Sequence, residues 1–286
     1  MTLTQDRLDV LHRIEQYERL GMFDRDAEND PPTRPLRPGE VDYLAQRWNS
    51  RLSTKLANQV ARRYFDRRIA CGDLVIKEVR GIQNYLAVAH GGAIITANHF
   101  HPYDNYAVYK VLEPHLGKQR LYKVIREGNY TSFGGLFGYF FRHCNTLPLP
   151  SERHVFREFK GALATLLARG EKVLIYPEQG MWWNYRKPRP LKPGAFHFAA
   201  LSGVPVLPFF LTMQHTERTD PSGFPIQAYT VHILPAIWPD AALSVRENTA
   251  RMGEYNSSVW KKTYEDFYGC PLTYTTENSE GDVCFT

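Results

Sequence analysis

The stretch Ala93-Ile94-Ile95-Thr96-Ala97-Asn98-His99-Phe100-His101-Pro102-Tyr103-Asp104 decides the fold of this chain. Small and apolar residues fill its first part, as in a buried strand, and polar side chains begin where the strand ends. The stretch Val173-Leu174-Ile175-Tyr176-Pro177-Glu178-Gln179-Gly180 repeats this pattern. Active sites of open α/β sheets lie at the carboxyl ends of the strands. We therefore expect the two turns to meet at one edge of a sheet.

Short apolar runs alternate with helical patterns through the middle of the chain. This alternation predicts an α/β fold, with a mixed, mostly parallel central sheet and helices on its faces. The expected strands cover residues 74–79, 93–97, 121–125, 173–176 and 204–211, and the expected helices cover residues 103–115, 132–141, 152–168 and 193–201.

Helical segments are expected on both sides of this region. Apolar spacing predicts helices over residues 3–20, 40–68 and 241–268, and repeated Asp and Pro predict a linker over 24–39. A polar acidic tail begins at Thr275. The predicted organisation is an N-terminal helical extension with its Pro-rich linker (1–70), a catalytic domain (71–240), and a C-terminal helix with a polar tail (241–286).

The helix expected over residues 40–68 allows two interpretations. Its apolar side chains recur every four residues from Leu44 to Tyr64, and cations lie beside them. Trp48 and the leucines could touch the acyl boundary of a membrane while the cations bind anionic head groups. Alternatively, the apolar stripe packs against the protein and the basic face is solvated. The cations are Arg47, Arg51, Lys55, Arg62 and Arg63.

Composition and charge narrow the class of protein. The 35 Lys and Arg residues exceed the 30 Asp and Glu residues by five, which favours anionic lipids, CoA or phosphate and predicts no nucleic-acid partner. The four scattered cysteines predict neither a disulfide framework nor a zinc site. A charged N-terminus and the lack of a long unbroken apolar run predict neither a signal peptide nor a transmembrane helix. The expected location is the cytoplasm, peripheral to the inner face of the cell membrane if the long helix binds lipid.

His99 and Asp104 are candidates for acid–base chemistry. Histidine suits proton transfer near neutral pH, and an Asp in the first turn of a helix that starts near Pro102 can reach back to hold its ring. Taken alone, such a pair is more often structural than catalytic. A carboxylate at the end of a second strand, Glu178, favours the catalytic interpretation.

These motifs together resemble the glycerolipid acyltransferase superfamily, which includes the 1-acylglycerol-3-phosphate acyltransferases. The resemblance covers roughly residues 74–235 and consists of four blocks in the expected order. Asn98, His99 and Asp104 match the first block, N-H-x-x-x-x-D, in full. The resemblance implies that His99 deprotonates the acceptor hydroxyl and that Asp104 orients it.

The third block of the family, F-P-E-G-T-R, resembles Tyr176-Pro177-Glu178 in its first three places. The resemblance assigns these residues, above all Glu178, to acceptor binding. The next three residues, Gln179-Gly180-Met181, depart from the family's Gly, Thr or Ser, and Arg, which help to position a phosphate-bearing acceptor. The resemblance therefore leaves the acceptor open.

Two further blocks complete the resemblance, and candidate cations lie near the second block and in one insertion. The second block resembles Asn145-Thr146-Leu147-Pro148-Leu149 but lacks the usual Arg, for which Arg153 is the nearest substitute and Arg142 another. The fourth block resembles Gly203-Val204-Pro205-Val206-Leu207-Pro208. The insertion Trp182-Trp183-Asn184-Tyr185-Arg186-Lys187-Pro188-Arg189 is suited either to stacking and phosphate contact, through Arg186 and Lys187, or to an exposed loop.

The expected function is transfer of a fatty acyl group from an acyl-CoA or acyl-ACP thioester to a hydroxyl of a lysophospholipid. The thioester is a co-substrate, and neither a cofactor nor a metal is expected. One alternative is a glycolipid or polyol acceptor. Others are a metal-dependent hydrolase that uses His99 and His101 with Asp104, and a lipid-binding module without catalysis.

Overall fold

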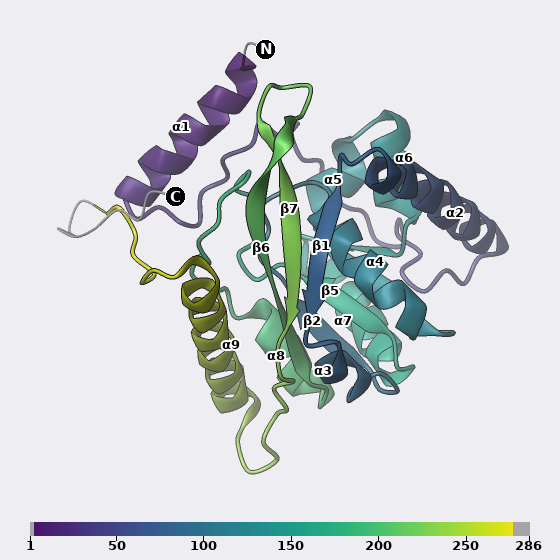
Figure 1. Cartoon of the computed structure of the whole chain (residues 1–286). Helices are drawn as coiled ribbons and strands as arrows, with labels where there is room; N and C mark the ends of the chain where they lie inside the picture. The colour runs from purple at the N-terminus through teal and green to yellow at the C-terminus, as the bar shows by residue number, and fades with distance from the viewer. Residues whose placement is uncertain (1–2, 277–286) are drawn as a thin grey trace.

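The expected α/β architecture is confirmed by a seven-stranded sheet at the centre of the molecule (Figure 1). This computed structural model describes residues 3–276. The strands are β1 (Val75–Arg80), β2 (Ala93–Thr96), β3 (Leu121–Arg126), β4 (Thr146–Leu149), β5 (Lys172–Ile175), β6 (Val206–Thr219) and β7 (Pro225–Ile233). Their order in the sheet is β1-β7-β6-β2-β5-β3-β4. Neighbouring strands are parallel except β6 and β7, which form an antiparallel hairpin.

The apolar pattern missed β4, the outer half of β6 and all of β7. The expected strand over 204–211 continues as β6 to Thr219, and the chain returns as β7. Side chains of β6 beyond Met213 are largely exposed. A strand end with solvent on both sides needs no apolar run, so hydrophobicity detected only the buried half of β6. β7 is buried, but Gln227, Thr230 and His232 interrupt its apolar residues.

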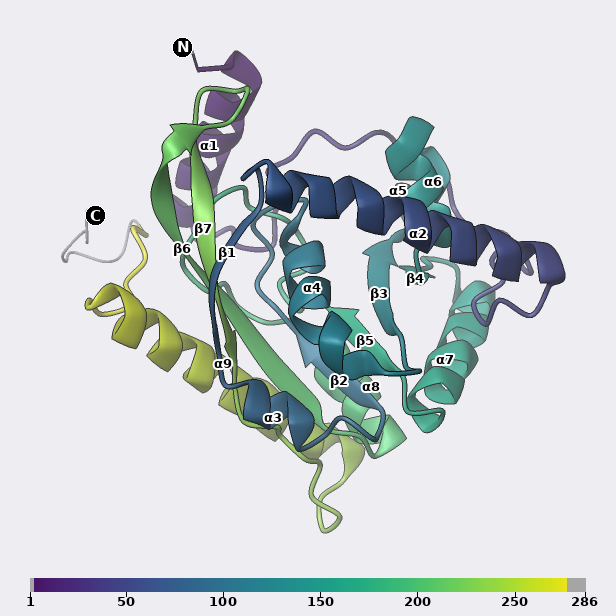
Figure 2. The same ribbon diagram turned by 45° about the vertical axis from the view of Figure 1, so that its right-hand side comes forward.

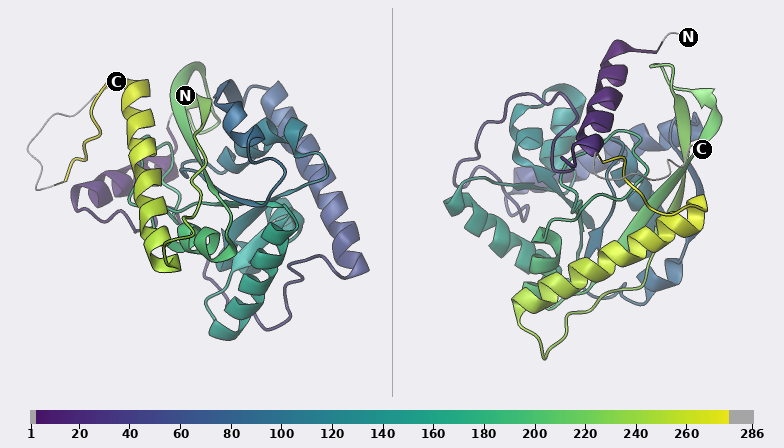
Figure 3. Two further views of the ribbon diagram at one scale, coloured as in Figure 1. Left: turned by 90° about the horizontal axis from the view of Figure 1, so that it is seen from below. Right: turned by 90° about the vertical axis from the view of Figure 1, so that its left-hand side faces the viewer.

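Helices cover both faces of the sheet, as Figure 2 shows. One face carries α2 (Trp48–Ala70), α3 (Ile82–Leu86), α4 (Asp104–Leu116) and α6 (Gly135–His143), and the other carries α7 (Arg153–Ala168), α8 (Gly194–Ser202) and α9 (Val245–Tyr268). The short α5 (Glu127–Ser132) follows β3 directly. In Figure 3, α9 runs along the sheet beside the β6–β7 hairpin.

The long N-terminal helix begins at Trp48, so the expected start at residue 40 is wrong. The Asp42 carboxylate accepts hydrogen bonds from the backbone N–H groups of Gln46 (2.9 Å) and Arg47 (2.8 Å). These bonds close a turn, in which Ala45 has a positive φ of 48°, and delay the helix. Leu44, the first residue of the apolar stripe, packs against the core, whereas Trp48 and Leu52 are 73% and 58% exposed.

Helix α1 (Gln5–Arg19) packs on the insertion after Glu178. Val10 and Ile14 of α1 form a small core with Trp182 and Trp183, both of which are buried. The Trp182 indole N–H also donates to the carbonyl of Arg25 (2.9 Å). The insertion therefore supports the N-terminal segment, and the expectation of an exposed loop is wrong.

The C-terminal helix α9 is confirmed close to its expected bounds. A capping box between Ser244 and Glu247 begins the helix, which explains its start a few residues after 241. The expected acidic tail from residue 277 onward, including Cys284, lies outside the described residues. Within residues 3–276, no helix is both long enough and apolar enough to cross a bilayer.

Candidate active site

The turn after β2 is held to the neighbouring strand by Asn98. This buried side chain donates to the carbonyl of Leu211 (3.0 Å) and accepts from the Leu211 N–H (2.8 Å) on β6. The chain therefore leaves the sheet at a defined point, immediately before His99. This explains physically why an Asn precedes the histidine.

His99 and Asp104 form the expected pair. The His99 Nδ1 and Asp104 Oδ2 atoms are 2.8 Å apart, and Asp104 is the first residue of α4. The carboxylate also accepts from the N–H groups of Phe100 (3.0 Å) and His101 (3.1 Å). Complete burial favours a higher pKa for Asp104, but the adjacent His99 and these hydrogen bonds outweigh it and lower the pKa. Asp104 is therefore an ionised group that orients the imidazole.

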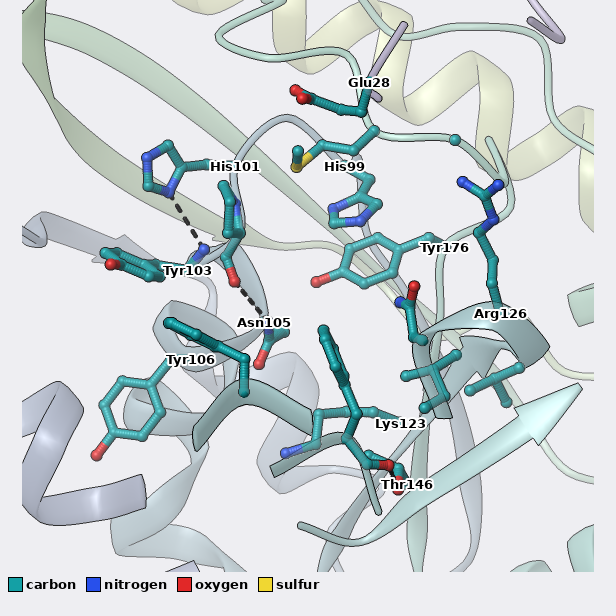
Figure 4. A pocket seen from close by; sticks show the side chains of 18 of the residues that line it. Glu28, His99, His101, Tyr103, Asn105, Tyr106, Lys123, Arg126, Thr146 and Tyr176 are labelled. Atoms are coloured by element: carbon teal, nitrogen blue, oxygen red, sulfur yellow. Dashed lines mark hydrogen bonds between the residues drawn. The ribbon is translucent and has the colours of Figure 1, made fainter. Parts of the chain in front are cut away.

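Tyr176 supports this pair from the end of β5. Its ring stacks on the His99 ring, with centroids 4.0 Å apart and an interplanar angle of 17°. Its hydroxyl donates to Asp104 Oδ1 over 2.5 Å. Figure 4 shows Tyr176 beside His99 at the wall of the cavity. Tyr176 thus contacts both members of the pair, besides its expected role toward substrate.

Glu178 lies beneath His99 and is 4% exposed. Its carboxylate accepts from the backbone N–H groups of His99 (3.0 Å) and Arg189 (2.8 Å). The Arg189 guanidinium also pairs with it at 3.2 Å. These contacts join the turn after β5 to the turn after β2. Glu178 is not among the residues that line the cavity, and its acceptor contact stays a prediction.

A cavity of about 1140 Å³ opens in front of His99. Ligand pockets for compounds of drug size occupy roughly 300–1,000 Å³, so this space is large enough for a chain and a head group together. The His99 side chain is 22% exposed toward it, and its Nε2 has no hydrogen-bond partner among the described residues. Aromatic side chains dominate one wall: Phe65, Tyr103, Tyr106, Tyr109, Phe133, Phe137, Phe140 and Phe141.

Among the residues expected to bind substrate, Pro177 lines this cavity. The expected cations Arg153, Arg186 and Lys187 do not. Arg153 is exposed at the start of α7. Arg186 contacts His215 at 3.0 Å, and Lys187 pairs with Glu18 at 2.7 Å, so both are engaged outside the cavity. The alternative candidate Arg142 donates to the carbonyls of Tyr130 (3.3 Å) and Phe133 (3.0 Å).

Arg126, the last residue of β3, is one of the cavity-lining cations that sequence reasoning missed. Because β3 is parallel to β5, its carboxyl end lies at the same edge as Tyr176. The rule that active sites lie at the carboxyl ends of the strands, here called the strand-end rule, would have indicated Arg126 if applied to every expected strand.

An acidic N-terminal segment, residues 24–30, contacts this half-exposed cation. Arg126 pairs with Asp30 at 2.8 Å and with Asp26. Glu28 pairs with Arg7 of α1 at 2.8 Å. All five of these charged side chains line the cavity together with Asp24, so the segment forms part of its wall.

His101 is a neutral neighbour of the pair. Burial lowers its pKa to about 4, although Asp104 acts in the opposite direction. Its Nδ1 accepts from the N–H of Tyr103 (3.2 Å). In the described part of the chain, His, Cys, Asp and Glu side chains form no cluster of three that could hold a metal ion.

Comparison with known proteins agrees with this geometry. The acyltransferase family model matches residues 77–212, which contain His99, Asp104 and Glu178. A search of curated proteins gives no match. Among solved structures, the 1-acyl-sn-glycerophosphate acyltransferase PlsC from Thermotoga maritima is similar in fold, with a TM-score of 0.52 and 17% identity over 94% of this chain and 98% of that chain.

Fold, motif and family model together define an enzyme of the acyltransferase class. Residues 77–212 match the acyltransferase family model, and they contain the four sequence blocks that resemble the glycerolipid acyltransferase superfamily.

Proposed function

We propose that this enzyme transfers a fatty acyl group from an acyl-CoA or acyl-ACP thioester to a hydroxyl of a lysophospholipid. His99 Nε2 accepts the hydroxyl proton as the oxygen attacks the thioester carbonyl. The tetrahedral intermediate collapses, the carbon–sulfur bond breaks, and the thiolate takes the proton from His99. Both substrates are bound together, and no acyl-enzyme is needed.

The observation that carries this proposal is the orientation of His99. One ring nitrogen is held by the buried Asp104 carboxylate, and the other faces a large, mostly apolar cavity without a partner among residues 3–276. The hydrogen bond to Asp104 favours the tautomer whose Nε2 can accept a proton. Such an arrangement is what a general base for a hydroxyl requires.

A lysophospholipid acceptor is supported by the position of Arg126. Its guanidinium lies at the mouth of the cavity, where a phosphate on the acceptor would be able to form a bidentate pair. The acceptor's phosphate would compete with Asp26 and Asp30 for this cation. The related PlsC protein is described as an acyltransferase for 1-acyl-sn-glycerophosphate, which agrees with this choice.

Peripheral membrane binding through α2 belongs to the same proposal. Trp48, Leu52 and Leu56 are 73%, 58% and 51% exposed along the first half of the helix. Cations flank them, including Arg51. An apolar stripe flanked by cations favours an anionic lipid surface. A lysophospholipid acceptor would be available at such a surface.

The test is acyl transfer from labelled acyl-CoA and acyl-ACP to a panel of lysophospholipids, glycolipids and polyols. We expect transfer to a lysophospholipid by the wild-type protein and its loss in His99→Ala. Asn105→Ala, which changes a cavity-lining side chain that among residues 3–276 bonds only to the Pro102 carbonyl, is the comparison variant and should keep measurable activity. Equal rates for wild type and His99→Ala would contradict the assigned base, and transfer only to sugars would contradict the acceptor class.

A further inference from the structure

Lys123 places an amine in the wall of the cavity, well inside the sheet. It is the third residue of β3 and lies opposite Thr146 on β4 and Leu174 on β5. Strands of a parallel sheet that is covered on both faces are normally apolar at such positions. Figure 4 shows the Lys123 side chain in the same cavity as His99.

The amine has no partner within the protein as described. No hydrogen bond or ion pair joins its Nζ to any residue between 3 and 276. Burial lowers the pKa of Lys123, and the nearby Cys144 thiol is the interaction that opposes this shift. A partly buried amine without a hydrogen-bond partner is stabilised by any acceptor that reaches it.

Lys172 shows how this protein satisfies a buried lysine that serves only the fold. It lies on the adjacent strand β5, and its Nζ donates to the carbonyls of Ala89 (2.9 Å) and Gly170 (3.1 Å) and to the Gln119 side chain (3.3 Å). Lys123 has no such set of carbonyls and faces the cavity instead. Its partner is therefore expected to come from a bound molecule.

The sheet register separates Lys123 from the reacting groups. Lys123 is level with Leu174, which is level with Ile95 on β2, and His99 follows four residues later. β2 ends at Thr96, before His99, so the amine lies deeper along the sheet than the edge that carries His99 and Tyr176, as Figure 4 shows. A thioester at His99 is out of reach of the amine. Only a remote part of an acyl chain in the cavity can meet it.

We infer that Lys123 selects acyl chains that have a hydroxyl group remote from the thioester. The inference rests on the proposed acyl transfer and specifies its donor. A hydroxyl accepts a hydrogen bond from an ammonium group or donates one to a neutral amine, so it satisfies either form. A carboxylate on the chain would also pair with the ammonium form, but it would first have to leave water, and the ion pair repays this desolvation only in part.

The experiment compares acyl-CoA donors of one chain length, unsubstituted or with one hydroxyl at successive positions, using one lysophospholipid acceptor. We expect kcat/KM for one hydroxyl position to exceed that of the unsubstituted chain by roughly three- to tenfold, the value of one hydrogen bond. Lys123→Met removes the amine at similar length and should abolish this preference. Thr146→Val should keep it, because the Thr146 hydroxyl already donates to the Phe141 carbonyl (2.6 Å).

The outcomes separate the inference from the function on which it rests. Transfer of the unsubstituted chain at least as fast as every hydroxylated chain by the wild-type enzyme overturns the inference, whether or not Lys123→Met folds. The same preference in wild type and Lys123→Met also overturns it. Absence of transfer from every donor, the unsubstituted chain included, refutes the proposed function and the inference with it.

Discussion

Replacing Tyr176 by Phe removes one hydroxyl from the site and leaves the ring that stacks on His99. The hydroxyl donates to Asp104 Oδ1 over 2.5 Å, and Asp104 is 0% exposed, so bulk water does not replace the lost donor. A hydrogen bond to a charged group contributes roughly 1.5–3 kcal/mol. We expect Tyr176→Phe to lower the free energy of unfolding by about 2 kcal/mol and the Tm by about 5 °C.

The same substitution should also change the pH dependence of catalysis. Loss of the donated hydrogen bond raises the pKa of Asp104, because that bond favours the ionised carboxylate. Because the ionised carboxylate is what orients His99, protonation of Asp104 removes this support at a higher pH than in wild type. The acidic limb of the pH profile of kcat/KM should therefore move to higher pH, while activity on the alkaline side persists.

Denaturant unfolding at neutral pH and the pH profile of CoA release test both effects. Tyr85→Phe is the matched control, because Tyr85 is also 0% exposed and its hydroxyl has no partner in the described structure. Its removal should leave stability unchanged or raise it. If Tyr176→Phe behaves like Tyr85→Phe in unfolding, and its pH profile superimposes on that of wild type, the assigned role of the hydroxyl is refuted.

Two further predictions concern the ion pair that supports the active site and the helix that we expect to contact lipid. Glu178→Gln weakens the pairing of the buried Arg189 and should lower the free energy of unfolding by about 3 kcal/mol in urea titrations, whereas the exposed Glu254→Gln should change little. An unchanged urea midpoint would contradict this. Replacing Trp48, Leu52 and Leu56 by Ser should weaken binding to phosphatidylglycerol vesicles by about tenfold or more in sedimentation assays. Leu201→Ser, exposed on α8, is the control, and equal binding by both variants would argue against the α2 surface.

The sequence predicted the centre of the site because that centre depends on local rules. Apolar runs located β2 and β5, and the strand-end rule placed His99, Tyr176 and Glu178 at one edge before any pairing was known. The spacing of His99 and Asp104 needs only one turn and the start of one helix. Their hydrogen bond at 2.8 Å follows from that short segment.

The remainder of the site depends on contacts between distant parts of the chain. Arg126 meets Asp26 and Asp30 across about a hundred residues, and nothing in the local pattern of either segment indicates this. The burial of Trp182 likewise depends on a distant segment, because Val10 and Ile14 of α1 pack against it. Arg153 is the cation nearest in sequence to the family position, but it is the first residue of α7 and is exposed to solvent.

The contacts around His99 explain how a turn between a strand and a helix can hold a catalytic base in place. Asn98 ties the turn to β6, Glu178 ties it to the turn after β5, and Asp104 gathers two further backbone N–H groups at the start of α4. Each tie uses a side chain that is almost completely buried, so rotation of the His99 backbone would leave a polar group without its partner. The cost of that loss keeps the imidazole aligned before substrate arrives, which is what preorganisation of a general base requires.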